Sequence, residues 1–231
     1  MNNRQNIAVI IPAYNEQDAI ANVIQDLPKE LISEIIVCNN ASTDNTSEVA
    51  TKAGATVLLE NKKGYGYACL AGINYLKKNT TPPDIVIFID GDYSDYPEQA
   101  VDLVREIVEH NRDLVIGSRA LGNKEKGSMT PQQVFGNALA TWLMKLFYGV
   151  KFTDLGPFRA IKWEALMQLN MQDKTYGLTI EMQLKAIKHK MNTSEIPMRY
   201  RKRIGVSKVS GTVKGTILAG YKIITAIFKH L

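Results

Sequence analysis

Two aspartates separated by one glycine follow a short apolar run in the stretch FIDGDYSDYPE. The apolar run IVIFI reads as a buried strand, so Asp90 and Asp92 stand where that strand ends. Two carboxylates this close repel each other unless a cation lies between them, and hard oxygen ligands favour Mg²⁺ or Mn²⁺. Since Mg²⁺ often binds one or two carboxylates together with substrate phosphates, the pair predicts a metal that carries a diphosphate.

A helix cap is the alternative explanation for this acidic cluster. A helix is predicted to begin near Pro97, because proline suits the first helical turn. Ser94 or Asp95 would then cap that helix, and the charges of Asp95 and Glu98 would face its positive end. We therefore expect the first two acids of the stretch to bind the metal and the last two to stabilise the helix.

Basic residues are concentrated between Lys185 and Lys208. The segment holds eight Lys or Arg residues and one acid, Glu195. Such a block suits phosphates, nucleic acid or an anionic membrane surface, and a solvated face is the plain alternative. Nucleic acid is the weaker of these partners, because the block lacks interleaved aromatic side chains apart from Tyr200.

Length and composition predict one folded domain. The 231 residues are 45% hydrophobic and 22% charged, which is ordinary for a globular protein and argues against wholesale disorder. The two cysteines have no metal-ligand spacing, which favours a reduced, intracellular protein without disulfides. The amino terminus has no signal-peptide pattern, and no stretch reaches the roughly 18 apolar residues of a spanning helix. These features predict a cytoplasmic location.

Strands and helices are predicted to alternate through the first half. The strands are expected at 7–13, 33–40, 55–60, 84–90 and 113–119, with helices at 16–27, 45–53, 66–78 and 97–110. This alternation is typical of an α/β fold with a Rossmann-like, mostly parallel sheet flanked by helices, and such sheets bind ligands beyond the carboxyl ends of their strands. Polar clusters at four strand ends should therefore converge on one crevice; they are Asn15 and Glu16, Asn39 and Asn40, Asp90 and Asp92, and Ser118 and Arg119.

The second half is predicted to be mainly helical. Helices are expected at 131–149, 162–169, 177–190 and 212–230, with a strand at 194–201 and loops at 152–160 and 203–211. We predict a single domain over 1–211, with a nucleotide-binding half to about 120 and an acceptor half after it. An amphipathic helix over 212–231 would follow, whose apolar stripe lies on a membrane surface or packs on the core.

Five stretches, in this order, resemble the motifs of family 2 glycosyltransferases, which have the GT-A fold. They are VIIPAYNE, CNNASTDNT, NKKGYGYACLAGI, FIDGDYSDYPE and IGSR. The later segments LGPFRAI and RKRIGVSKVSGT resemble the polyprenyl-phosphate glycosyltransferases, the dolichyl-phosphate mannose and glucose synthases. The resemblance covers about residues 6–212. It implies a metal-dependent enzyme that moves a hexose from a nucleotide sugar to a polyprenyl phosphate with inversion.

The resemblance also implies which residues bind the nucleotide. Contacts to the base and ribose would come from Pro12, Ala13, Tyr14, Asn15, Glu16, Asn40 and Asp44. Gly64 and Gly66 would let the backbone approach the nucleotide, unless they only form a turn.

The catalytic charges follow from the same resemblance. The sugar diphosphate would be held at Asp90, Gly91 and Asp92, with Mg²⁺ or Mn²⁺ on the two aspartates. Arg119 would face a phosphate. Arg203 and Lys208 would hold the acceptor phosphate or the departing diphosphate.

Two departures from the family pattern affect the donor and the metal. The family often reads DDGS where this chain has Asn39-Asn40-Ala41-Ser42. An Asn hydrogen-bonds a base but carries no charge, so the nucleotide is left open, with UDP-glucose and GDP-mannose as the donors to try first. Ser94 stands where the dolichyl-phosphate mannose synthases have a metal-binding Gln, and a hydroxyl is a poorer ligand.

The identity of the acceptor decides whether a base is needed. A phosphate acceptor is already ionised at neutral pH, so its oxygen attacks the anomeric carbon without one. A hydroxyl acceptor, in cell-wall, polysaccharide or glycolipid synthesis, would need a carboxylate base, and Glu181 and Asp154 are the candidates. Glu181 is otherwise structural or bonded to a site cation. A binding or scaffold protein without turnover is the remaining alternative.

A polyprenyl phosphate lives in a bilayer, so a membrane surface is an expected partner. The segments 131–149 and 212–231 are the ones that would touch it. We therefore expect peripheral association with the cytoplasmic face of the inner membrane, with a nucleotide sugar and a polyprenyl phosphate or other lipid as substrates.

Overall fold

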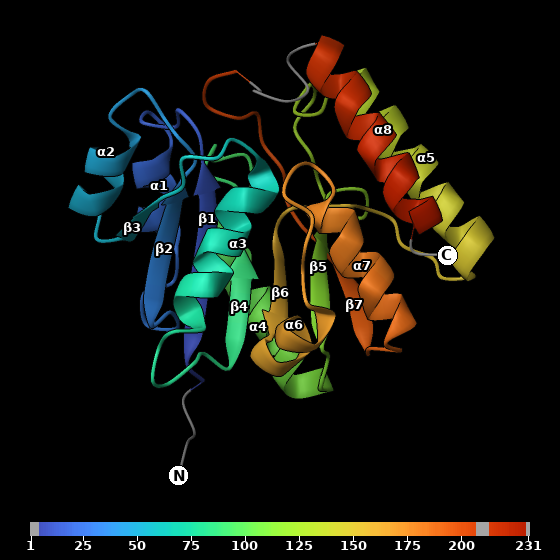
Figure 1. The fold of residues 1–231 in the computed structure, drawn as a ribbon, viewed down its shortest axis with the longest axis horizontal. Helices are drawn as coiled ribbons and strands as arrows, with labels where there is room; N and C mark the ends of the chain where they lie inside the picture. Colours follow the sequence, from blue (N-terminus) through green and yellow to red (C-terminus); the bar gives the residue numbers. More distant parts are fainter. Residues whose placement is uncertain (1–4, 207–212, 230–231) are drawn as a thin grey trace.

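The computed structural model describes residues 5–206 and 213–229, with the backbone alone between 213 and 219. Its strands form a seven-stranded sheet in the order β3-β2-β1-β4-β6-β5-β7 (Figure 1). The strands are β1 (Ile7–Ala13), β2 (Glu34–Asn39), β3 (Thr56–Leu59), β4 (Ile85–Phe88), β5 (Leu114–Ser118), β6 (Arg159–Lys162) and β7 (Thr193–Pro197). Neighbouring strands are parallel except where β6 pairs with β4 and β5. The predicted mostly parallel α/β sheet is confirmed.

Helices cover both faces of this sheet. They are α1 (Ile20–Asp26), α2 (Thr46–Lys52), α3 (Tyr65–Leu76), the short 3₁₀ helix η1 (Pro97–Gln99), α4 (Ala100–His110), α5 (Pro131–Tyr148), α6 (Trp163–Leu169), α7 (Leu178–Lys188) and α8 (Val213–Lys229). In β1, Ala8 and Ile10 face the hydrophobic cluster beneath α3, whereas Ile7 and Val9 face the cluster beneath α1 and α4. Burial on both sides explains why β1 reads as a continuous apolar run.

Strand β6 corrects the predicted loop at 152–160. Its four residues, Arg159–Lys162, lie antiparallel between β4 and β5, so those two strands are not neighbours. A four-residue strand that follows a Gly-Pro pair carries too little periodicity to be recognised in the sequence. The helix expected from 162 accordingly begins at Trp163.

Helix α1 begins four residues later than predicted, at Ile20. The backbone N–H of Glu16 donates to Thr46 Oγ1 at 2.9 Å, and that of Gln17 donates to Asp44 Oδ2 at 3.2 Å. These contacts hold the segment after β1 in a turn against the start of α2. The turn keeps the crevice at the end of β1 open.

Helices α5 and α8 lie side by side at the end of the sheet, beyond β5 and β7 (Figure 1). The rings of Phe147 and Phe228 meet edge to face with centroids 5.3 Å apart, and Tyr148 Oη donates to the Ile227 carbonyl at 2.7 Å. Ile227 is fully buried, while Phe228 is half exposed. The terminal helix therefore packs on the rest of the protein and still presents apolar side chains to solvent.

Candidate active site

One cavity of about 890 Å³ opens at the carboxyl ends of β1, β2, β4 and β5. Most of the predicted site residues line it: Pro12, Ala13, Tyr14, Glu16, Asn40, Gly64, Asp90, Gly91, Asp92, Arg119 and Arg203. Asn15, Asp44 and Glu181 do not line it, and Lys208 lies outside the described residues. The expected convergence of strand ends on one crevice is what the topology produces, because parallel strands end at the same edge of a sheet.

One carboxylate oxygen of Asp90 is left unsatisfied within the described part of the chain. Its Oδ1 is buried and has no hydrogen-bond partner among the described residues. Burial, followed by repulsion from Asp92, raises the pKa of Asp90 to about 6, against the opposing charges of Arg203 and Arg119 and a hydrogen bond with Tyr65. A buried, unsatisfied carboxylate oxygen beside a second carboxylate is a fit for a divalent cation.

Asp92 is held in place from two sides. Its Oδ1 accepts from the backbone N–H of Ser94 at 2.9 Å and from the Ser94 hydroxyl at 2.5 Å, while Arg203 pairs with its Oδ2. Over the described residues no three His, Cys, Asp or Glu side chains group as metal ligands. The residues present therefore suit Mg²⁺ or Mn²⁺ that takes its other ligands from a substrate or water, and Ser94 orients Asp92.

The predicted cap by Ser94 or Asp95 is wrong, although Glu98 does lie in the first turn of η1. The residue before η1 is Tyr96, and no side chain caps that helix. Asp95 is buried with its Oδ2 unpaired, and burial, followed by the charge of Asp90, raises its pKa well above the usual range. Glu98 is exposed and pairs with Arg199 at 2.7 Å. The signal that favoured a cap was the spacing to Pro97, which carries no information about burial.

Arg119 is fixed by Asp154, beside the cavity. Its Nε and Nη2 donate to the two Asp154 oxygens at 2.8 and 2.6 Å, and its backbone N–H donates to Oδ2 at 2.7 Å. Burial lowers the pKa of Arg119, but the Asp154 carboxylate raises it further, so the net shift is upward. Asp154 is fully buried and does not line the cavity. It orients Arg119 and leaves no free oxygen facing a substrate.

Glu181 is likewise engaged outside the cavity. It accepts from the backbone N–H groups of Gln172 and Asp173, at 3.1 and 2.8 Å, and pairs with Lys185 at 2.7 Å. These contacts fix the loop that joins α6 to α7. The geometry favours the structural alternative for Glu181 over the catalytic one.

The amide and the glycines that were predicted to bind the nucleotide make contacts within the protein. Asn40 donates to the Lys62 carbonyl and accepts from the Gly64 N–H, both at 2.7 Å, so its amide shapes the wall of the cavity. A Cβ on Gly64 would lie 2.4 Å from the Lys174 carbonyl oxygen, and one on Gly66 would lie 2.1 Å from that of Asp173. The close approach at these glycines is therefore to the loop before α7.

Several residues that line the cavity were not predicted from the sequence. Helices α5 and α8 also line the cavity, with residues that include Phe135, Gly136, Asn137, Leu139, Gly220 and Ile223. Tyr65, which hydrogen-bonds Asp90, and Tyr176 also line it. Helix α5 reads as a plain apolar helix, so nothing in its sequence marks which side faces a ligand.

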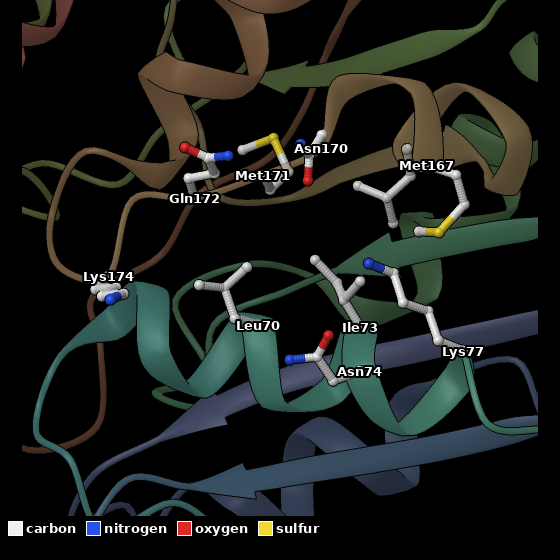
Figure 2. A pocket seen from close by; sticks show the side chains of 10 residues that line it. Leu70, Ile73, Asn74, Lys77, Met167, Asn170, Met171, Gln172 and Lys174 are labelled. Carbon is white, nitrogen blue, oxygen red and sulfur yellow. The ribbon is translucent and has the colours of Figure 1, made fainter.

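A second cavity of about 410 Å³ lies between α3 and α6 (Figure 2). Leu70 and Ile73 on α3 lie opposite Met167 on α6, and Lys77 and Lys174 also line the cavity. No carboxylate lines it, so the acidic chemistry belongs to the larger cavity.

Comparisons with known proteins agree with this geometry. The sequence profile of the family described as "Glycosyl transferase family 2" matches residues 8–169. An uncharacterised glycosyltransferase of Mycobacterium tuberculosis is 32% identical over 217 residues, covering 92% of this chain and 94% of the relative. A dolichyl-phosphate hexose transferase of Haloferax volcanii is 27% identical, covering 92% and 90% of the two chains. A UDP-N-acetylglucosamine–dolichyl-phosphate N-acetylglucosaminyltransferase of Methanococcus voltae is 28% identical and covers 84% of each.

The fold is also found among solved structures. Glucosyl-3-phosphoglycerate synthase from Mycobacterium tuberculosis, in complex with Mn²⁺, UDP and glucosyl-3-phosphoglycerate, superposes with a TM-score of 0.77 and 21% identity. The match covers 98% of this chain and 80% of that one. Across the described residues, none of the helices is long and apolar enough to cross a membrane.

Proposed function

The chain belongs to glycosyl transferase family 2, and from this premise we propose that it moves a hexose from UDP-glucose or GDP-mannose to a polyprenyl phosphate. The observation that carries the proposal is the continuity of the cavity. The same cavity is lined by Asp90, Asp92 and Arg203 and by apolar residues of α5 and α8. A substrate with an anionic head and an apolar tail suits such a cavity. The dolichyl-phosphate transferases among the relatives support the same acceptor class.

The donor would lie over the ends of β1 and β4. Tyr14, with Lys63 5.1 Å from the centre of its ring, would contact the nucleotide, and Gly91, which lines the cavity, would lie beside the diphosphate. Asp90 and Asp92 would hold Mg²⁺ or Mn²⁺, which supplies positive charge to the leaving diphosphate. Tyr65 would keep Asp90 oriented through their hydrogen bond.

The acceptor phosphate would enter beside Arg203. An ionised phosphate oxygen forms a bond to the anomeric carbon while the bond from that carbon to the diphosphate breaks, and the diphosphate keeps the electron pair. In-line attack inverts the anomeric carbon. The chain's own contribution is to bring two anions together and to balance their charge with Arg203 and Arg119.

A hydroxyl acceptor, the alternative, would need a base. Asp154 accepts three hydrogen bonds from Arg119, and Glu181 is bonded to its own loop and to Lys185. Neither lines the cavity, which supports a phosphate acceptor over a hydroxyl one.

A substrate screen tests the proposal. UDP- and GDP-sugars would each be incubated with Mn²⁺ or Mg²⁺ and with a long polyprenyl phosphate in detergent, a polyprenol without phosphate, or 3-phosphoglycerate. We expect sugar transfer only to the polyprenyl phosphate, detected as product mass. Transfer to the polyprenol or to 3-phosphoglycerate instead would refute the acceptor assignment.

A further inference from the structure

The part of the active-site cavity that is lined by α5 and α8 has walls whose chemistry indicates which ligand binds there. The cavity runs from the anionic site to the two helices, where its boundary includes Phe135 and Leu139 on α5 and Ile223 on α8. We call this part the helix groove. Charged side chains do not line it on α5, where the polar lining residues are the amides Gln132, Gln133 and Asn137.

The two helices contact each other at their carboxyl ends. There Phe147 packs on Phe228, and Tyr148 is bonded to the Ile227 carbonyl. The lining residues come from the first half of α5 and from the middle of α8. The helices are therefore joined at one end and bound an open space nearer the other.

Two glycines border this open space, although neither packing nor backbone conformation requires a glycine at either position. Gly136 of α5 and Gly220 of α8 both line the cavity, and a Cβ built on either meets no described atom within 4 Å. Neither has the positive φ that favours glycine. A glycine inside a helix costs about 0.5–1 kcal/mol relative to alanine, so packing and backbone geometry both favour a larger residue at these positions.

We infer that the helix groove binds the first isoprene units of the acceptor, and that Gly136 and Gly220 keep it wide enough for the branched chain. The inference rests on the proposed function, because it takes the phosphate of the acceptor to lie beside Arg203. The apolar chain would then lie against Phe135, Leu139 and Ile223, the apolar side chains with which α5 and α8 line the same cavity. The two glycines would therefore determine which acceptor chains fit the groove, and they would not affect the choice of sugar.

Substitution of the glycines separates chain recognition from chemistry. Gly136→Leu and Gly220→Leu would be compared with Gly136→Ala and with Ala138→Leu, which changes an exposed residue of α5 outside the cavity. Acceptors would be a long polyprenyl phosphate and dimethylallyl phosphate, which has a single isoprene unit. We expect the two Leu variants to lose about tenfold or more in kcat/KM for the long acceptor. Nucleotide affinity and transfer to dimethylallyl phosphate should stay at the wild-type level, as should both activities of the Ala138→Leu control.

Two results would overturn the inference. Equal losses for both acceptors would mean that the substitutions disturb the anionic site, and unchanged kcat/KM for the long acceptor would mean that its chain lies elsewhere. Wild-type protein that transfers to neither acceptor would refute the proposed function itself, and the inference with it.

Photo-crosslinking gives a readout that does not depend on turnover. A polyprenyl phosphate carrying a benzophenone on an early isoprene unit would be irradiated with wild-type protein, and the labelled peptides would be identified by mass. Labels on α5 and α8 are expected. Labels confined to other elements, such as the α3–α6 cavity, would overturn the placement.

Discussion

Arg203 occupies the carboxylate that we propose as a metal ligand. Its guanidinium pairs with Asp92, and the charges of Asp92 and Asp90 raise its pKa against the lowering effect of burial. A divalent cation bound at Asp92 would therefore compete with this arginine for the carboxylate, and a bound phosphate would draw the arginine away. This competition makes the contribution of Arg203 to metal binding opposite in sign to its contribution to turnover.

Replacing Arg203 should separate these two effects. We expect Arg203→Gln to bind Mn²⁺ several-fold more tightly than wild type in the absence of nucleotide, because a competing cation is gone, and to transfer sugar more slowly. Free Mn²⁺ can be followed by its paramagnetic resonance signal. Lys202→Gln, which removes an exposed neighbouring charge, is the control. Unchanged or weaker Mn²⁺ affinity in Arg203→Gln would contradict the competition.

Asp92 should be required for metal-dependent donor binding. In Asp92→Asn the amide keeps the shape of the side chain but loses its charge, so the affinity for UDP or GDP should become independent of Mn²⁺. Titration calorimetry with and without the metal measures this. Asp102→Asn, at an exposed aspartate on α4, should behave as wild type. Mn²⁺-dependent nucleotide binding that survives in Asp92→Asn would refute the metal assignment.

The raised pKa of Asp90 predicts a pH-dependent cost in the metal-free protein. The value moves from 3.8 to about 6, so the fold favours the neutral carboxyl. Stability from this shift is complete below about pH 4 and is lost as pH rises through about 6. Asp90→Asn, which is always neutral, should therefore match wild type at about pH 3.5 and exceed it at pH 7.5 by on the order of 3 kcal/mol. Urea unfolding with a chelator present tests this. Equal stability at pH 7.5 would show that the ionised carboxylate is not strained.

At the scale of elements, the Arg119–Asp154 pair joins the end of β5 to the segment before β6. The backbone N–H groups of Thr153 and Asp154 in turn donate to Glu195 of β7, at 2.8 and 3.0 Å. These contacts connect the end of β5, the segment before β6 and strand β7 beside Arg119. The pair is buried on both sides, so removing one partner leaves an uncompensated charge.

Breaking this pair should be costly. We expect Asp154→Asn to lower the free energy of unfolding by about 3–5 kcal/mol, because it leaves Arg119 buried without a counter-charge. Glu98→Gln breaks an exposed ion pair with Arg199 and should cost less than about 1 kcal/mol. Both follow from urea titrations. Similar losses in the two variants would mean that the buried pair adds little to the joint between β5 and β6.

Elements differed in how well the sequence predicted them, for identifiable reasons. The long apolar runs of β1 and β4 predicted strands and, through their polar ends, most of the cavity's lining. Strand β6 is too short to show a period, and its place in the sheet depends on pairing with residues more than 70 positions earlier. The packing of Gly64 and Gly66 against Asp173 and Lys174 joins residues about 110 positions apart, so no local pattern reveals it.

At the scale of the molecule, α5 and α8 present an apolar surface beside the cavity. Its exposed side chains are Phe135, Trp142, Leu146, Tyr221, Ile224 and Phe228. An enzyme that takes its acceptor from a bilayer would place this surface at the interface, with basic residues toward anionic headgroups. The helices pack on each other and on the core, so the surface is formed without a spanning segment.

Liposome flotation tests this peripheral association. The full-length protein should float with vesicles that contain anionic lipid, and Trp142→Ser combined with Leu146→Ser should reduce the floated fraction several-fold without lowering thermal stability. Val108→Ser, at an exposed apolar residue of α4 away from α5 and α8, is the control. Wild-type protein that stays at the bottom of the gradient while active on dimethylallyl phosphate would exclude the membrane as a partner.

The antiparallel strand β6 also dictates when the sheet can close during synthesis. Strands β1 to β4 can pair as they leave the ribosome, but β4 has no partner on its far side until residues 159–162 have emerged. Strand β5 joins the sheet only through β6, and β7 then pairs with the outer edge of β5. A nascent chain that stalls near residue 120 therefore exposes the apolar, unpaired edge of β4 and leaves β5 without either of its partner strands. A chain that ends between β5 and β6 should therefore aggregate or be captured by chaperones. It should not fold into a fragment that binds nucleotide.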